Sequence, residues 1–162
     1  MLHGFPPIID KDVNVLVLGS FPSPVSLNVE EYYGNKGNDF WKVLEKVIGE
    51  NLHDEPFDVK RRKLLTHHIG LWDVFAEAER EGSADSNFNS VIYNDFATLF
   101  DEYPNIKIVL ITGNKAYDSY DVLRIKDKPY FRIPSTSGIN RRLDVDGKAK
   151  LVLEIFEKLL FL

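Results

Sequence analysis

The amino-acid sequence predicts an α/β fold with a mainly parallel β-sheet and helices on both of its faces. Short apolar runs rich in β-branched residues alternate along the chain with longer segments of helical periodicity. Such runs, without polar alternation, are typical of strands buried on both faces, as in a parallel sheet. The 162 residues, of which 44% are hydrophobic, suit one core, so we expect a single domain over residues 1–162.

The first predicted elements lie between residues 13 and 49. Val13–Leu18 is short, apolar and rich in valine, which predicts a buried parallel strand. The prolines and glycines of Gly19–Gly37 predict a loop, and loops of that length in compact domains are usually functional. Apolar residues then recur at helical spacing from Asn38, where we expect a helix to begin, to Gly49, where it ends.

The remainder of the chain continues the alternation of helices and strands. Helices are predicted over Phe57–His67 and Asp95–Phe100, and the apolar segment Ile69–Phe75 is typical of a strand or a buried extended segment. The later elements are a strand over Ile106–Ile111, a Gly113-Asn114 turn into a helix that carries Ala116 to Leu123, a short strand over Pro129–Ile133, a polar loop over Pro134–Gly138 and an amphipathic helix over Leu151–Leu160.

Three loops are expected to meet at one edge of this sheet. In folds of this class, ligands bind at the carboxyl ends of the parallel strands. The segments that follow the predicted strands are Gly19–Pro24, Thr112–Asn114 and Pro134–Asn140. The pattern therefore predicts a ligand site between these three segments.

Composition and charge restrict the classes of function. The sequence has no cysteine, which excludes disulfide scaffolds, zinc–thiolate sites and iron–sulfur clusters. The longest apolar stretch near the N-terminus is too short for a membrane span or a signal sequence, so we expect a cytoplasmic protein without membrane association. The net charge of −5 argues against indiscriminate binding to nucleic acid, because phosphate contacts need a basic face.

Two local basic clusters could nevertheless supply phosphate contacts on an acidic protein. One is Lys60–Lys63, for which the solvated face of a helix is an alternative interpretation. The other consists of Arg141 and Arg142 together with Lys148 and Lys150. A protein of this net charge would have to collect its phosphate contacts at such a cluster.

The first loop begins with Gly19, Ser20, Phe21 and Pro22, directly after a predicted strand. Glycine lets a ligand approach the backbone closely, and proline stiffens the turn. A purely structural turn has the same composition, so this loop by itself leaves both interpretations open.

The next segment places aromatic and amide side chains just before a helix. A base that is flipped out of DNA needs an aromatic face to stack on and amides that bind its edge. Tyr33 and Phe40 could provide that face, and Asn38 an amide. The alternative is that Asn38 caps the helix and that Phe40 and Trp41 belong to its core side.

The third loop contains three consecutive hydroxyl side chains, Ser135, Thr136 and Ser137, before Gly138. Hydroxyls and exposed backbone N–H groups bind anions, and Arg141 and Arg142 follow as partners for phosphates. An ordinary serine/threonine turn is the alternative interpretation.

Titratable side chains offer further candidates for catalysis. Asp73 and Asp85 could act as a general base, or they could cap turns and hold arginines. His67 and His68 could protonate a leaving base at neutral pH. A histidine at the end of a helix also stabilises the helix dipole without any catalytic role.

Six short blocks in this order resemble the hypoxanthine-DNA glycosylases, the branch of the uracil-DNA glycosylase superfamily that is often called family six. The resemblance extends from about residue 13 to the C-terminus. The blocks are Gly19–Ser23, Tyr32-Tyr33 with Asn38–Trp41, Gly70–Val74, Arg80–Asp85, Asn94–Phe96 and Pro134–Ser137.

This resemblance implies a three-layer α/β/α fold with a central four-stranded, mainly parallel sheet. It also implies that Asn38 is catalytic, whereas most of the superfamily carries an Asp or Asn at the position of Phe21. The residues expected to bind the base are Gly19, Ser20, Phe21, Pro22, Tyr33, Phe40, Thr112 and Gly113. The residues expected to bind DNA are Ser23, Ser135, Thr136, Ser137, Gly138, Asn140, Arg141 and Arg142.

The implied activity is that of a monofunctional DNA N-glycosylase of base-excision repair. Such an enzyme flips out hypoxanthine and/or uracil from double- or single-stranded DNA and hydrolyses the N-glycosidic bond. It requires no metal, no organic cofactor and no obligate protein partner. A mismatch-specific uracil/thymine glycosylase and a catalytically inactive DNA- or nucleotide-binding domain of the same fold are the alternatives.

The sequence departs from the usual pattern of the branch at three places. Asn35-Lys36 stands where His-Pro is common, and Gly138-Ile139-Asn140 stands where Pro-Ala-Asn is common. Thr112-Gly113 replaces the usual Asn-Gly at the end of a strand. These departures concern the segments that are expected to select the base and to bind DNA.

Overall fold

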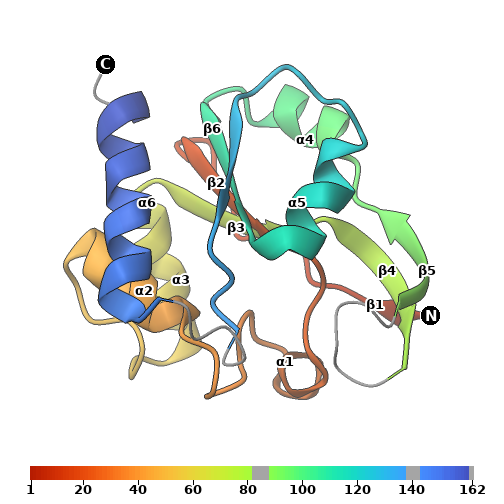
Figure 1. The fold of residues 1–162 in the computed structure, drawn as a ribbon, viewed down its shortest axis with the longest axis horizontal. Helices are drawn as coiled ribbons and strands as arrows, with labels where there is room; N and C mark the ends of the chain where they lie inside the picture. The colour runs from red at the N-terminus through yellow and green to blue at the C-terminus, as the bar shows by residue number, and fades with distance from the viewer. Residues whose placement is uncertain (82–87, 138–142, 161–162) are drawn as a thin grey trace.

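The fold is a four-stranded parallel sheet between two groups of helices, in a computed structural model that describes residues 1–81, 88–137 and 143–160 (Figure 1). The strands lie in the order β3-β2-β6-β7, and all three neighbouring pairs are parallel. Their bounds are β2 Val15–Gly19, β3 Ile69–Asp73, β6 Ile108–Thr112 and β7 Tyr130–Ile133. The four-stranded parallel sheet is therefore confirmed.

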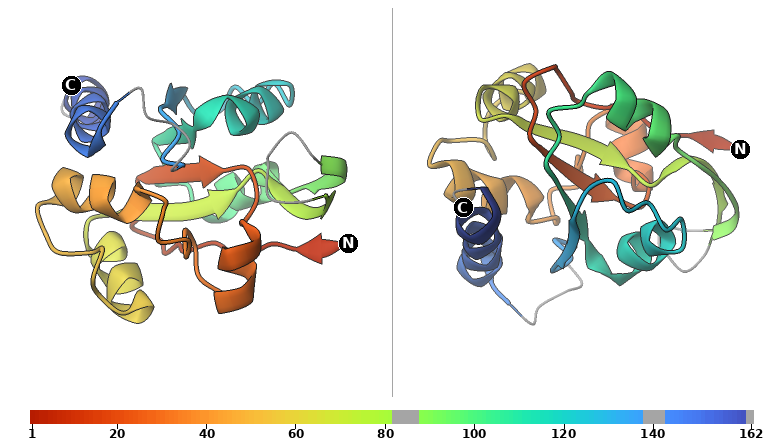
Figure 2. Two further views of the ribbon diagram at one scale, coloured as in Figure 1. Left: turned by 60° about the horizontal axis from the view of Figure 1, so that its bottom comes forward. Right: turned by 90° about the horizontal axis from the view of Figure 1, so that it is seen from above.

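Alternate residues of the strands supply two separate cores. Val15 and Val17 of β2 pack on one face of the sheet with α2, α3 and α6. Leu16 and Leu18 pack on the other face with α4 and α5. The helices are α2 Phe40–Ile48, α3 Phe57–Thr66, α4 Phe96–Glu102, α5 Gly113–Asp121 and α6 Val145–Leu160. Figure 2 shows α6 alongside α2, so the C-terminal helix packs on the helix that follows Tyr32 and Tyr33.

A second, antiparallel sheet was not predicted. It has the order β1-β4-β5, with β1 Leu2–His3, β4 Phe75–Arg80 and β5 Phe88–Tyr93. The predicted segment Ile69–Phe75 is divided, because β3 ends at Asp73 and β4 begins at Phe75. Strand β4 contains three charged residues, so its own sequence carries little strand signal, and one of its two partners, β1, is distant along the chain.

The long predicted loop contains a short helix, α1 Pro24–Val29. Ser23 caps it, since its Oγ accepts a hydrogen bond from the Ser26 N–H at 3.1 Å. Pro24 occupies the first turn, where its missing N–H costs nothing. The final helix likewise begins earlier than predicted, at Val145, and Asp144 accepts a hydrogen bond from the Gly147 N–H at 2.8 Å.

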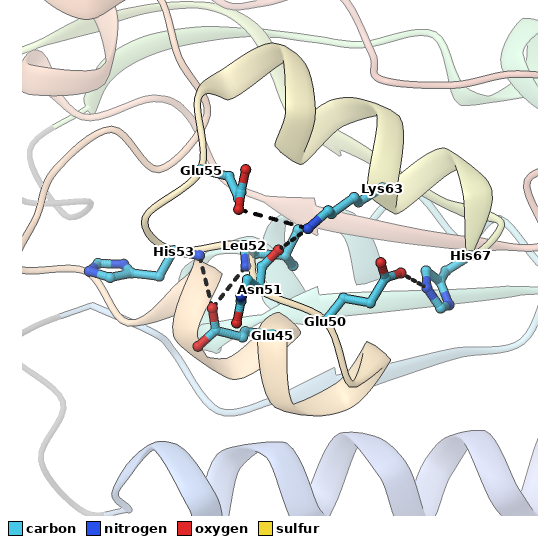
Figure 3. A network of polar contacts seen from close by, with 8 residues as sticks. All are labelled: Glu45, Glu50, Asn51, Leu52, His53, Glu55, Lys63 and His67. Carbon is cyan, nitrogen blue, oxygen red and sulfur yellow. Dashed lines mark hydrogen bonds and ion pairs between the residues drawn. The ribbon is translucent and has the colours of Figure 1, made fainter.

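A polar network stabilises the connection between α2 and α3 (Figure 3). One carboxylate oxygen of Glu45 accepts hydrogen bonds from the backbone N–H groups of Leu52 and His53. Lys63 donates to the Asn51 carbonyl at 2.8 Å, and His67 pairs with Glu50. The basic cluster Lys60–Lys63 therefore lies on α3, where at least Lys63 has a structural role.

His67 and His68 lie at the edge of the sheet opposite to the predicted site. They immediately precede β3, so they stand at its amino end, whereas Asp73 stands at its carboxyl end. Their position at the end of α3 agrees with the structural interpretation rather than with a role in proton transfer. Among the described residues, no helix is long and apolar enough to cross a membrane.

Candidate active site

The carboxyl ends of the four strands bring the predicted loops together at one edge of the sheet. Gly19 of β2 is the register partner of Asp73 of β3. The loops after β6 and β7 also touch, because a Cβ atom on Gly113 would lie 3.2 Å from the Cβ atom of Ser135. Thr112 turns its hydroxyl toward β2 and donates to the Leu18 carbonyl at 3.2 Å. The predicted convergence of these loops is therefore confirmed.

Gly19 is the point of closest packing in this edge. A Cβ atom there would lie 2.9 Å from an oxygen of Asp73 and 2.9 Å from the hydroxyl oxygen of Tyr33. Both distances are shorter than a real Cβ contact, so a larger residue here would displace the ends of the Asp73 and Tyr33 side chains. Because Gly19 has no side chain, the Asp73 carboxylate and the Tyr33 phenol lie directly against the backbone at the carboxyl end of β2.

Gly19→Ala is expected to lower the free energy of unfolding by about 1–3 kcal/mol, the usual effect of overpacking a tight site. It should also displace Tyr33 and slow any reaction that uses this edge. Chemical denaturation checks the first effect. Gly37→Ala is the matched control, because that glycine is exposed and its nearest neighbour would be Asn35 Oδ1 at 3.4 Å. Equal stability of the two variants would contradict the assignment.

Phe21 and Pro22 are buried and held by Arg80 of β4. The Arg80 guanidinium donates to the Pro22 carbonyl at 2.8 Å and lies 5.5 Å from the centre of the Phe21 ring. Phe88 of β5 packs edge-on against Phe21, and its ring centre also lies 5.6 Å from the Arg80 guanidinium. The small antiparallel sheet thus supports the first loop, a role that sequence reasoning missed for Arg80 although this residue opens one of the six blocks.

Tyr33 and Phe40 form a stacked pair, with ring centroids 3.7 Å apart and planes at 13°. Phe40 is fully buried in the core under α2, whereas Tyr33 is only partly buried. Tyr33 also has a left-handed backbone with φ 52°, which turns the chain sharply at this point. Phe40 therefore supports the Tyr33 ring from below, and its predicted direct contact with a base is replaced by a role in the core.

Asn38 lies at the start of α2, beside the third loop. Its Oδ1 accepts a hydrogen bond from the Phe40 N–H at 2.9 Å, so its amide turns toward the first turn of α2, as the alternative interpretation expects, although the N-cap residue itself is Asp39. The next residue, Asp39, donates its N–H to the Thr136 carbonyl at 2.8 Å. The segment that carries Asn38 is therefore bound to the Ser135–Ser137 loop through the backbone.

The third loop is ordered by its own hydroxyl groups. Thr136 is buried, and the Ser137 N–H donates to Ser135 Oγ at 3.2 Å. The other predicted DNA contacts in this region, Gly138, Asn140, Arg141 and Arg142, lie outside the described residues, as does Asp85. Lys148, which the sequence grouped with the arginines, is only 1% exposed and cannot contact phosphate.

The buried carboxylate of Asp73 affects its surroundings at the base of the site. Burial, followed by the charge of Asp73 and the neighbouring Tyr33, raises the pKa of Tyr32 well above its ordinary value. Tyr32 therefore stays neutral and donates its hydroxyl hydrogen to the Pro6 carbonyl at 2.8 Å.

Across the described part of the chain, no group of three histidine or acidic side chains is placed to hold a metal ion.

Known proteins are similar to this chain in both sequence and fold. The sequence model of the family described as the uracil DNA glycosylase superfamily matches residues 6–160. A protein named hypoxanthine DNA glycosylase from Methanosarcina acetivorans is 42% identical over 148 residues, 91% of this chain and 94% of that protein. One with the same name from Methanosarcina barkeri is 41% identical over 140 residues, 86% of this chain and 89% of that protein.

A solved structure agrees with these sequence relatives. The solution NMR structure of a proposed uracil DNA glycosylase from Methanosarcina acetivorans has a TM-score of 0.85 and 38% sequence identity. The likeness covers 98% of each chain, so it is not confined to the sheet. On the match to the family and these relatives, the chain belongs to the uracil DNA glycosylase superfamily.

Proposed function

We propose that this protein is a monofunctional DNA N-glycosylase of base-excision repair. It flips a deaminated base, hypoxanthine and/or uracil, out of DNA and hydrolyses its N-glycosidic bond. The observation that carries the proposal is its identity of 41–42% to two hypoxanthine DNA glycosylases over most of the chain. The convergence of Gly19, Tyr33 and Ser135 at one edge of the sheet supports it. Its partner is DNA that contains a damaged base, so we expect it to act at the nucleoid.

The reaction builds positive charge on the sugar and negative charge on the departing base. A neutral amide is no strong base at pH 7, so Asn38 acts by orientation and polarity. Its Oδ1 already accepts from the Phe40 N–H, which fixes the amide plane and leaves a second lone pair for the attacking water. Its NH₂ group can donate to the base. Phosphates of the DNA stabilise the sugar cation.

The base is expected to stack on Tyr33, because Phe40 holds that ring from the other face. Gly19 permits close approach at the end of β2, and Phe21 and Pro22 form the wall that Arg80 supports. The hydroxyls of Ser23, Ser135 and Ser137 are assigned to phosphates. We also assign Ser20, Thr112 and Gly113 to the base side of the site.

A strand-nicking assay on a panel of oligonucleotides tests this function. Duplex and single-stranded substrates would carry deoxyinosine, deoxyuridine or a G:T mismatch, and alkali would reveal abasic sites. Excision of hypoxanthine or uracil is the expected result. Preference for mismatched uracil or thymine would indicate a mismatch-specific enzyme. No excision of any base would overturn the proposal and favour a DNA-binding domain without catalysis.

Replacement of both Arg141 and Arg142 by alanine is expected to weaken DNA binding to all sequences alike. A protein of net charge −5 must collect its phosphate contacts locally, and each phosphate that is no longer neutralised lowers the salt slope by about one. The slope of log affinity against log salt should therefore fall by about one to two. Fluorescence anisotropy at several salt concentrations measures it. An unchanged slope would direct attention to Arg61 and Arg62, which are exposed on α3.

A further inference from the structure

Lys148 of α6 is a charged side chain enclosed by the protein. It is 1% exposed, and its Nζ lies 3.9 Å from a carboxylate oxygen of Asp39, whose side chain is 17% exposed. Removing an ammonium group from water is strongly unfavourable unless a counter-charge accompanies it. The same two helices also carry an ordinary surface pair, Lys46 with Asp146 at 3.0 Å. Burial therefore distinguishes Lys148 from the pair beside it.

Asp39 occupies the position that joins α2 to the candidate active site. It is the N-cap residue of α2, yet its side chain makes no capping hydrogen bond. An aspartate at this position usually accepts from its own helix, whereas this carboxylate is paired with α6 instead. Its backbone N–H meanwhile donates to the Thr136 carbonyl, and its carbonyl accepts from the Val43 N–H. One residue thus links α2, α6 and the third loop.

The candidate catalytic residue is directly attached to this link. Asn38 precedes Asp39, and its amide oxygen is bound to the N–H of Phe40, which follows Asp39. A rotation of the Asp39 backbone would therefore move both ends of the hydrogen bond that orients the Asn38 amide. It would also move Thr136 and, with it, the hydroxyls of the Ser135–Ser137 loop.

We propose that Lys148 is a positioning residue for base excision. It holds Asp39, and through Asp39 it fixes the position of Asn38 relative to the Ser135–Ser137 loop. This inference rests on the proposed glycosylase function. Lys148 is too deeply buried to touch a base or a phosphate, since only 1% of it is exposed. Its effect on the reaction is geometric. A substitution far from the reacting atoms can displace a reacting group slightly, and such a displacement can lower the rate by about 10²-fold.

Three variants separate positioning from simple stabilisation. Lys148→Met removes the ammonium and should lower the single-turnover excision rate at saturating DNA by about 10²-fold. Lys46→Met removes the exposed pair of the same helices and should leave the rate unchanged. The double variant Asp39→Asn/Lys148→Met removes both buried charges, so it should recover thermal stability but not the excision rate. Recovery of the rate together with stability would show a structural role only and overturn the proposal.

A double-mutant cycle tests the route through Asn38. If Lys148 acts by orienting that amide, adding Lys148→Met to Asn38→Ala should lower the rate little further. Full multiplication of the two losses would contradict the proposal.

The NMR signals of the Asp39 and Phe40 amides and of the Asn38 side-chain NH₂ report the geometry without any reaction. They should shift in Lys148→Met and stay in place in Lys46→Met. If the parent protein excises no base, the glycosylase function fails by itself. The amide shifts then decide the positional role, and unshifted signals would overturn it.

Discussion

Replacing Asn38 by alanine is expected to lower the rate of base excision by about two to three decades while DNA affinity changes little. The loss of one preorganised polar group next to a developing charge typically costs about 3–4 kcal/mol of transition-state stabilisation. DNA affinity depends mostly on phosphates, which Asn38 does not bind in the proposed arrangement. Single-turnover rates and binding isotherms on deoxyinosine and deoxyuridine substrates give the two quantities separately.

Asn38→Asp makes the same test sharper. A carboxylate keeps an acceptor for the Phe40 N–H, so the start of α2 is preserved. It can also activate water and stabilise the sugar cation, but only when it is deprotonated. Excision by this variant should therefore rise with pH through the pKa of the introduced carboxyl, whereas the parent has no such rise from this residue. A parental rate in Asn38→Ala would show that Asn38 serves only as a cap.

Phe40→Ala is expected to destabilise the protein by about 3–5 kcal/mol, the usual cost of emptying a buried aromatic site. Phe40 is fully buried, stacks on Tyr33 and packs edge-on against Trp41. Its removal would leave a cavity under the Tyr33 ring that the surrounding helix and strands cannot close. The shift in the denaturant midpoint measures the loss.

Phe40→Leu separates support of Tyr33 from general stability. Leucine keeps most of the apolar burial, so the expected loss is much smaller than for alanine. Tyr33 would nevertheless lose its stacking partner, and excision should fall more than stability does. Phe57→Leu is a matched control, because the partly buried Phe57 also packs edge-on against Trp41, whereas the ring stacked on Tyr33 is that of Phe40. Equal excision by both leucine variants would argue against Tyr33 as the stacking surface.

The parallel sheet was predictable because its signal is local. Each of Val15–Gly19 and Ile108–Thr112 is an uninterrupted apolar run, which a strand buried on both faces requires. The order of strands and loops then places the carboxyl ends at one edge, where the structure has them. The short helix α1 was missed, because its six residues fall in a segment whose prolines and glycines predict a loop.

The roles of individual site residues were harder to predict from the sequence than the fold was. The resemblance indicated Asn38, and the structure adds that its amide is oriented by the Phe40 N–H. Phe40 was expected to face a base, but it lies in the core and supports Tyr33. Lys148 was grouped with basic residues that could bind phosphate, and it is enclosed beside Asp39.

The sequence by itself determined the class of fold, the edge where the strand-end loops meet and the family, because each depends on patterns within short segments. Only the tertiary structure decided which side chains are enclosed and what supports the site. Arg80 meets the Pro22 carbonyl across 58 positions of the chain, and Lys148 is brought to Asp39 by the packing of α6 on α2. Contacts of this kind depend on how distant segments pack, and a buried charge is tolerated only where folding supplies its partner.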